Sequence, residues 1–227
     1  RPGTRVAAPA AHMAARRGLL VDYGGVLTTS LAVNFGAFCV ETGVDPARLK
    51  AVLAAAYASA SYGSDLDGLV VSVETGRLPV EEFDRKLAAA LSQGLEVPLE
   101  ETGLAARMFA GAGPDPRMTS AVSAARAAGI RTALVSNTWG RHAYPDGLTG
   151  SFDAMVLSGE VRIRKPDPEI YLLAAERIGL APEECVFVDD IPVNVDGARA
   201  VGMAGVLHRD SAITIPKLEA LLEVPLA

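Results

Sequence analysis

Five polar side chains stand where short apolar runs of this sequence end. Asp22 follows GLLV, Ser136 and Asn137 close IRTALVSN, and Asp189 and Asp190 follow or end CVFVDD. In open α/β sheets the site forms at the carboxyl ends of the strands, so residues at these positions are candidates for chemistry. We therefore expect the five side chains to meet at one edge of a sheet.

Lys165 adds a cation to this set. It lies in RKPDPEIY at the predicted start of a helix, where a nearby anion is already favoured. A carboxylate, a hydroxyl, an ammonium group and an acidic pair can together bind Mg²⁺ and hold a phosphoryl group against Asp22. The metal and the lysine would offset the repulsion between an anionic nucleophile and an anionic substrate.

Short β-rich runs separated by helical patterns must position these residues. The runs lie at 18–22, 130–136, 154–157, 185–190 and 204–207. They are apolar without the polar alternation of a half-exposed strand, which is typical of strands covered on both faces. Since nearly all of them alternate with helices after residue 115, the pattern predicts a doubly wound parallel-sheet α/β core.

Local signals delimit several of the helices. Asp-Pro pairs at 45–46, 115–116 and 167–168 each predict a helix start, because aspartate can accept hydrogen bonds at the N-cap and proline pre-sets the first helical φ. Gly129 and Gly179 predict the ends of two of these helices, since glycine adopts left-handed backbone at little cost.

About a hundred residues between the first two β-runs carry helical patterns only, which predicts an inserted all-helical cap. The helical segments are expected around 35–42, 46–60, 79–93 and 99–110. The expected domains are a core of residues 18–31 and 113–227, a cap of residues 32–112, and a disordered extension or expression remnant at residues 1–17.

Composition narrows the classes of function. The chain has 27 acidic and 21 basic residues among 227, a net charge of −6, and no basic stripe, so we expect no nucleic-acid binding. The 18-residue uncharged stretch at 23–40 is interrupted by glycines and polar residues and does not predict a membrane span. Cys39 and Cys185 lie in apolar contexts without CxxC spacing, which favours a reducing, cytoplasmic setting.

Four segments in order resemble the motifs of the haloacid dehalogenase (HAD) superfamily of hydrolases, in its helical C1-cap (HAD-IA-like) subgroup. These segments are LLVDYGGVLTTS, ALVSN, RKPDPEIYLLAAERIG and VFVDDIPVNVDGARAVGM. The resemblance covers about residues 19–208, with the helical insertion at the place of the family's cap. It implies a strand order of 5-4-1-2-3 and catalysis by Asp22, Ser136 and Lys165, with an aspartyl-enzyme intermediate at Asp22.

The resemblance also implies a binding site for substrate and metal. Ser136, Asn137, Lys165 and Gly25 would contact the substrate. Mg²⁺ would be held by Asp22, the carbonyl of Gly24 and Asp190. Behind these ligands, Asp189 and Asn194 would support the site.

One position departs from the pattern of the superfamily's phosphatases. They carry a second aspartate two residues after the nucleophile, which protonates the leaving oxygen and later activates water, whereas this chain has Gly24. An alkoxide needs that proton, but a halide, an aryloxide or an acyl group leaves without it. The haloacid dehalogenases proper also lack this aspartate. They differ from this chain, however, because they do not have the metal-binding acidic pair that is found here at Asp189 and Asp190.

Three functions therefore stand side by side. The favoured one is a Mg²⁺-dependent phosphohydrolase of a small soluble substrate. The others are a metal-independent hydrolytic dehalogenase and a catalytically impaired member that binds a phosphorylated ligand or a protein partner.

The missing acid has three candidate replacements, which are Asp67, Glu74 and Tyr23. Asp65 and Asp67 spell the phosphatase signature in DLDG, but this segment follows YASASYGS and not a β-run, which predicts a loop between cap helices. Trp139 and Tyr144 follow the second motif and could line the pocket or pack as ordinary aromatic residues.

Overall fold

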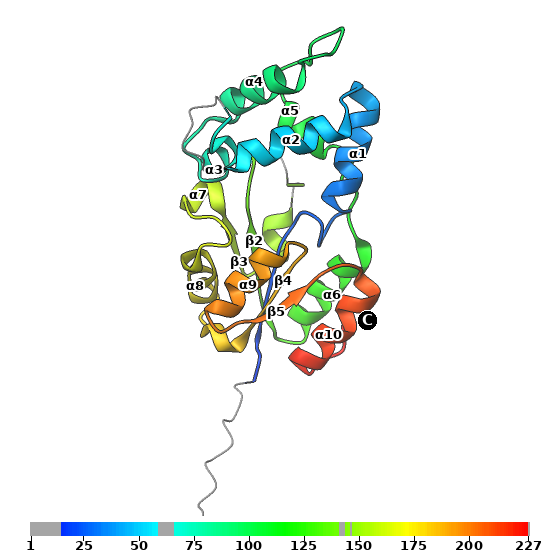
Figure 1. The fold of residues 1–227 in the computed structure, drawn as a ribbon. Helices are drawn as coiled ribbons and strands as arrows, with labels where there is room; N and C mark the ends of the chain where they lie inside the picture. Colours follow the sequence, from blue (N-terminus) through cyan, green and yellow to red (C-terminus); the bar gives the residue numbers. More distant parts are fainter. Residues whose placement is uncertain (1–14, 59–65, 141–143, 146, 227) are drawn as a thin grey trace, which may run out of the picture.

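A five-stranded parallel sheet forms the centre of the molecule (Figure 1). The computed structural model describes residues 15–58, 66–140, 144–145 and 147–226, so residues 1–14 of the expected extension lie outside the described part. The strands are β1 (Gly18–Val21), β2 (Arg131–Ser136), β3 (Ala154–Leu157), β4 (Cys185–Asp189) and β5 (Ala204–Leu207). Their order, β3-β2-β1-β4-β5, is the one the motifs implied, which confirms the doubly wound fold.

Strand β1 is buried on both faces at the middle of the sheet. Leu20 lies opposite Ala133 of β2 and Phe187 of β4 in the parallel register. Successive side chains point to opposite faces, so Leu19 and Leu20 belong to two different buried clusters. A continuous apolar run is what such a strand requires.

Helices cover the two faces of the sheet (Figure 1). The core helical segments are α6 (Pro116–Ala127), η2 (Leu148–Ser151), α7 (Ser158–Val161), α8 (Pro168–Arg177), η3 (Pro182–Glu184), α9 (Pro192–Ala200) and α10 (Ser211–Leu222). Met118 of α6 and Leu218 of α10 join Leu19 in one cluster, while Tyr171 of α8 and Ala198 of α9 join Leu20 in the other. None of the described helices has the length and apolar character that crossing a bilayer requires.

The three Asp-Pro pairs begin helices as predicted. The side chain of Asp45 accepts from the Arg48 N–H at 2.9 Å, and Asp115 and Asp167 cap α6 and α8 in the same way. Gly129 (φ +87°) and Gly179 (φ +72°) follow the ends of α6 and α8.

The insertion between β1 and β2 folds into helices above the carboxyl edge of the sheet (Figure 1). They are α1 (Leu31–Thr42), α2 (Pro46–Tyr57), α3 (Leu69–Glu74), α4 (Val80–Leu91) and α5 (Leu104–Phe109). These helices share a core of their own, in which Phe83, Leu87 and Met108 are fully buried. Helix α3 was not predicted, because its sequence LVVSVE is short and β-branched. Burial of Val70 and Val73 against the other cap helices outweighs that weak local preference.

The chain enters and leaves the cap side by side. The Thr29 N–H donates to the Gly113 carbonyl at 2.8 Å, and the Asp115 N–H donates to the Leu27 carbonyl at 2.8 Å. An antiparallel bridge joins Thr28 to Pro114 between these bonds. The two connections therefore form one paired ribbon.

Asp153 ties the edge strand β3 to β2. Its Oδ2 accepts from the Thr132 N–H at 2.8 Å and from the Thr132 hydroxyl at 3.2 Å, and Arg126 lies 3.4 Å from Oδ1. Burial opposes ionisation of this carboxyl, but these donors and the arginine outweigh it and hold the pKa of Asp153 below its usual value.

Replacing Asp153 tests this link. We expect Asp153→Asn to lower the free energy of unfolding by about 1 kcal/mol near neutral pH, because the charge-assisted bonds to Thr132 are weakened. The depressed pKa means that this stabilisation is full above the unfolded-state pKa of about 4 and is lost as pH falls through the lower folded-state pKa. Urea unfolding from pH 7 down to about pH 3 measures it.

The exposed variant Asp196→Asn, at an i,i+3 surface pair with Arg199, is the control and should change stability by less than about 0.5 kcal/mol. An Asp153→Asn deficit that stays constant with pH would show that the charge is not its cause.

Candidate active site

Lys165 links the carboxylates that end β1 and β4. Its Nζ lies 2.7 Å from Asp22 Oδ1 and 2.7 Å from Asp189 Oδ2, and its side chain is only 1% exposed. Burial opposes the ammonium charge, but Asp189 and Asp22 outweigh it and raise the pKa of Lys165 above its usual value. The predicted lysine is thus a buried cation held between two strand-end carboxylates.

Asp22 depends on that cation for its own charge. Its backbone N–H continues the sheet by donating to the Val188 carbonyl at 2.9 Å, which fixes the carboxylate at the carboxyl end of β1. Burial raises the pKa of Asp22 to about 7, Lys165 opposes this shift, and Asp189 adds to it. Additional positive charge at the site would therefore favour the ionised, nucleophilic form.

Three carboxylates converge where the motifs implied a metal. One oxygen each of Asp22, Asp189 and Asp190 lies within 4.8 Å of the others. Asp190 Oδ1 is buried without a hydrogen-bond partner, and burial, with Asp189 nearby, raises the pKa of Asp190 to about 6. A divalent cation with a preference for oxygen ligands would satisfy that oxygen, so the residues present fit Mg²⁺.

Asp189 is held on all sides. Asn194 Nδ2 donates to both of its oxygens at 3.1 Å, and the Ile191 N–H donates to Oδ1 at 2.8 Å. With Lys165 also bound, Asp189 has little freedom to move. These contacts agree with a supporting role for Asp189 and Asn194 behind the metal ligands.

Gly25 makes room for Asp190. Its φ is +74°, and a Cβ at this position would lie 2.3 Å from Asp190 Oδ2. Gly25 was predicted to contact the substrate, but it is not among the described residues that line the cavity. Its missing side chain instead lets the turn after β1 approach the acidic pair.

Ser136 and Asn137 differ in what they offer a ligand. The Tyr144 hydroxyl donates to Ser136 Oγ at 2.8 Å, which leaves the Ser136 proton free to donate into the cavity. Asn137 accepts from the Lys165 N–H at 2.9 Å and donates to the Lys165 carbonyl at 3.1 Å. Both ends of this amide are thus occupied in fixing the backbone at Lys165.

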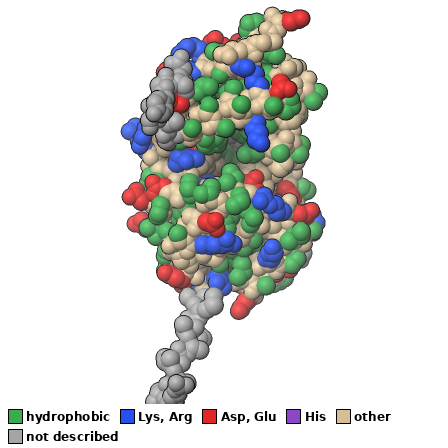
Figure 2. Space-filling view, viewed as in Figure 1, with side chains coloured by type: hydrophobic (Ala, Val, Ile, Leu, Met, Phe, Trp, Pro, Cys, Tyr) green, Lys and Arg blue, Asp and Glu red, His purple; other side chains and the backbone are tan. Residues whose placement is uncertain are grey.

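A cavity of about 640 Å³ lies over these residues, between core and cap. Figure 2 shows the surface hollowed between the two parts. Asp22, Gly24, Ser136 and Lys165 line its floor, and helices α1, α2 and α5 contribute the opposite wall. The predicted residues that follow β1, end β2 and precede α8 therefore line one cavity.

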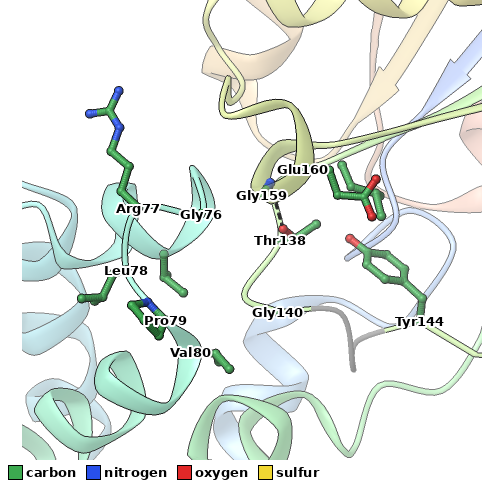
Figure 3. A pocket seen from close by; sticks show the side chains of 12 residues that line it. Gly76, Arg77, Leu78, Pro79, Val80, Thr138, Gly140, Tyr144, Gly159 and Glu160 are labelled. Carbon is green, nitrogen blue, oxygen red and sulfur yellow. Dashed lines mark hydrogen bonds between the residues drawn. The ribbon is translucent and has the colours of Figure 1, made fainter.

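A second cavity of about 410 Å³ adjoins the first at the seam between cap and core (Figure 3). Thr138 and Tyr144 line both cavities. The cap approaches closely here, since a Cβ on Gly76 would lie 2.4 Å from the Gly159 carbonyl oxygen. Thr138 Oγ1 accepts from the Gly159 N–H at 3.2 Å, as the dashed line in Figure 3 shows.

Glu74 connects the cap to the core and was predicted only as a possible acid. Its side chain is 3% exposed, Oε2 accepts from Arg164 Nε at 2.6 Å, and Oε1 accepts from Trp139 Nε1 at 3.1 Å and the Tyr57 hydroxyl at 3.2 Å. Both oxygens are therefore engaged. The sequence carried no signal for this pairing, because Arg164 is 90 residues away.

The other candidate acids lie in different places. Tyr23 lines the cavity, with its ring 4.9 Å from that of Tyr144, and burial raises its pKa. Asp67 is not among the described lining residues, and Asp65 lies outside the described part of the chain. Of the three candidate acids, Tyr23 and Glu74 are thus the ones found among the described lining residues of the cavity.

Substitution of Gly25 tests the acidic pocket. We expect Gly25→Ala to lower the free energy of unfolding by about 1–3 kcal/mol, because it combines left-handed backbone with a clash at Asp190. The rise in thermal midpoint caused by Mg²⁺ should also shrink, since Asp190 must move. Chemical and thermal unfolding with and without Mg²⁺ measure both effects.

Gly36→Ala, in an exposed helical position with open space around the new methyl group, is the matched control. It should stabilise by about 0.5–1 kcal/mol and leave the response to Mg²⁺ intact. An unaltered Mg²⁺ response in Gly25→Ala would remove Asp190 from the metal site.

Solved structures share this fold. A HAD family enzyme of Bacteroides thetaiotaomicron, in complex with magnesium and inorganic phosphate, superposes with a TM-score of 0.62 at 21% identity over 86% of this chain and 94% of that one. A dehalogenase superposes with a TM-score of 0.63 at 19% identity over 91% and 97%. Since one likeness is to a phosphate complex and the other to a dehalogenase, these similarities bear on the fold alone.

Curated relatives include phosphatases. Phosphatase MT3486 of Mycobacterium tuberculosis is 32% identical over 154 residues, which is 64% of this chain and 69% of that protein. The chain spans 11% to 58% of the length of the first four curated relatives. Among them is the phosphorylated carbohydrates phosphatase of Thermotoga maritima, 32% identical over 126 residues (48% of this chain and 58% of that protein).

A family model matches most of the chain. It describes a haloacid dehalogenase-like hydrolase and covers residues 17–202. This range contains the first three motifs, all but the last residue of the fourth, the helical insertion and every predicted site residue. The chain belongs to the haloacid dehalogenase-like hydrolase family.

Proposed function

We propose that this protein is a Mg²⁺-dependent phosphohydrolase that cleaves a small phosphate ester through an aspartyl-enzyme intermediate at Asp22. The observation that carries the proposal is the buried contact of Lys165 Nζ with Asp22 and Asp189, beside the unpartnered oxygen of Asp190. Metal-free dehalogenation would not need a cluster of carboxylates that can bind a divalent cation. The phosphatases among the relatives also support the proposal.

In the first step a carboxylate oxygen of Asp22 attacks phosphorus. The bond from phosphorus to the leaving oxygen breaks, and its electron pair departs with that oxygen. The Ser136 hydroxyl donates a hydrogen bond to a phosphoryl oxygen, and Lys165 stabilises the charge on the transferred group. Mg²⁺, bound by Asp22, the Gly24 carbonyl and Asp190, would supply further positive charge against the repulsion between the two anions.

In the second step water attacks the phosphorus of the aspartyl phosphate. The bond to Asp22 breaks, the carboxylate is restored, and inorganic phosphate leaves with the oxygen of that water. The proton released by the attacking water goes to solvent. Because Asn137 fixes the backbone of Lys165, the ammonium group keeps its place through both steps.

Gly24 limits which esters can react. Without an acid at this position the leaving oxygen must carry its negative charge unaided, which an aryloxide does far better than an alkoxide. Packing does not demand the glycine, because a Cβ here would meet Leu31 at 3.5 Å, an ordinary contact. The limit on leaving groups therefore comes from the absence of an acidic side chain at position 24, and not from a lack of space there.

We also propose a reducing, cytoplasmic setting. Cys39 lies in the cap and Cys185 in the core, and both are buried and free. Unpaired thiols in two separate apolar cores act as small hydrophobic residues and gain nothing from an oxidising compartment.

Ester hydrolysis tests the proposal directly. We expect p-nitrophenyl phosphate to be hydrolysed only with Mg²⁺, propyl phosphate to react poorly, and Asp22→Asn to lower kcat by at least about a hundredfold. Inorganic phosphate release and nitrophenolate absorbance measure these rates, and an unchanged thermal midpoint in Asp22→Asn shows that the variant is folded.

Failure would take one of two forms. Halide release from a 2-haloacid without Mg²⁺ would support the dehalogenase alternative. Stabilisation by inorganic phosphate without turnover of either ester would support a binding role.

Restoring an acid at position 24 should widen the range of esters. We expect Gly24→Asp to raise kcat for propyl phosphate at least about tenfold, because the leaving alkoxide now receives a proton, and to change p-nitrophenyl phosphate turnover little. Gly24→Asn, which fills the same space without a transferable proton, is the matched control. Equal rates in the two variants would show that space, and not acidity, controls the reaction.

A further inference from the structure

The wall of the large cavity opposite Asp22 is apolar and aromatic. Phe35 of α1, Leu53 of α2 and Phe109 of α5 line it, and Trp139 reaches it from the loop after β2. The Phe35 and Phe109 ring centroids lie 5.7 Å apart, and those of Phe109 and Trp139 lie 5.2 Å apart. Three neighbouring rings thus form a continuous surface in the space where the organic part of an ester must lie.

The polar atoms on this wall already have partners. The Tyr57 hydroxyl and Trp139 Nε1 both donate to Glu74. Asn34 Oδ1 accepts from the Thr29 hydroxyl at 3.1 Å. Among the described lining residues, the wall therefore presents few free groups to the hydroxyls of a sugar, and an unpaired buried hydroxyl is costly.

The charged residues of the cavity are also paired. Arg164 is bound to Glu74, and Lys165 is bound to Asp22 and Asp189. Within the described lining, a carboxylate or second phosphate on the substrate would find no cation that is not already neutralised. Burying such a charge without a partner is strongly unfavourable.

We infer that the organic part of the substrate is an uncharged aromatic group, so that the ester is an aryl phosphate. The inference rests on the proposed phosphohydrolase function and adds to it the class of substrate. Gly24 requires an acidic leaving oxygen, which a phenolic hydroxyl provides, and the row of rings accepts the aromatic face. A cavity of about 640 Å³ is within the range for drug-sized ligands, with space for fused rings.

Phosphate release from three esters tests this inference. Phenyl phosphate and 2-naphthyl phosphate have leaving groups of closely similar acidity, so a difference between them reports on burial of the second ring. We expect kcat/KM with Mg²⁺ to be about tenfold higher for the naphthyl ester, because more apolar surface leaves water. The third ester, 4-carboxyphenyl phosphate, should react more slowly than phenyl phosphate although its leaving group is the more acidic one.

Two variants locate the effect. Phe35→Ala should reduce the naphthyl preference to less than about threefold, because a face of the aromatic wall is removed. Val40→Ala, on the same helix but 87% exposed, is the matched control and should keep the preference. The comparison of esters with the unaltered protein decides the inference even if Phe35→Ala does not fold.

The outcomes separate the two levels of the proposal. Equal kcat/KM for phenyl and naphthyl esters, or a faster reaction of the carboxyphenyl ester, would overturn the aromatic substrate and leave phosphate hydrolysis standing. No phosphate from any of the three esters would overturn hydrolysis itself and the inference with it.

Discussion

The buried ammonium group of Lys165 is the interaction on which the site depends. Parallel pairing of β1 with β4 brings Asp22 and the acidic pair to adjacent strand ends, in a region that water reaches poorly. Carboxylates so close together repel one another strongly in a medium of low dielectric constant. Lys165 offsets that repulsion from one side, and the free oxygen of Asp190 leaves the other side open to a divalent cation. The fold thus holds a charge arrangement that is favourable only when cations complete it.

The cap covers this arrangement, and the Glu74 carboxylate is one of the contacts that join the cap to the core. Glu74 accepts hydrogen bonds from Arg164, the residue before Lys165, and from Trp139, which lies in the loop after β2. Arg164 and Trp139 are each next in sequence to residues that line the large cavity, namely Lys165 and Thr138. The Glu74 contacts therefore fix the position of the aromatic wall relative to Lys165 and to the end of β2.

Much of the core could be predicted from the sequence because its signals are local. Strand-end aspartates follow apolar runs directly, and Asp-Pro pairs carry their own caps, so the sheet, the starts of α2, α6 and α8 and the meeting of the acidic residues at one sheet edge could be predicted. The contacts that were missed involve the cap and the loop after β2. Glu74 with Arg164 and Tyr144 with Ser136 depend on how the cap and a loop settle, which no spacing encodes. The substrate contacts of Asn137 and Gly25 stay predictions: Asn137 lines the cavity and bonds to the backbone of Lys165, and Gly25 lies against Asp190.

The paired ribbon at the base of the cap has a consequence for how such proteins diversify. Because Leu27 and Thr29 are hydrogen-bonded to Asp115 and Gly113, the two ends of the insertion are held together by their own backbone contacts, without help from the cap helices. The entropy lost on bringing the two ends of an insertion together grows only slowly with its length, by about 0.6 kcal/mol for each doubling. The segment between the two ends can therefore be exchanged for a longer or shorter one as a single block, while the carboxyl edge of the sheet retains its geometry.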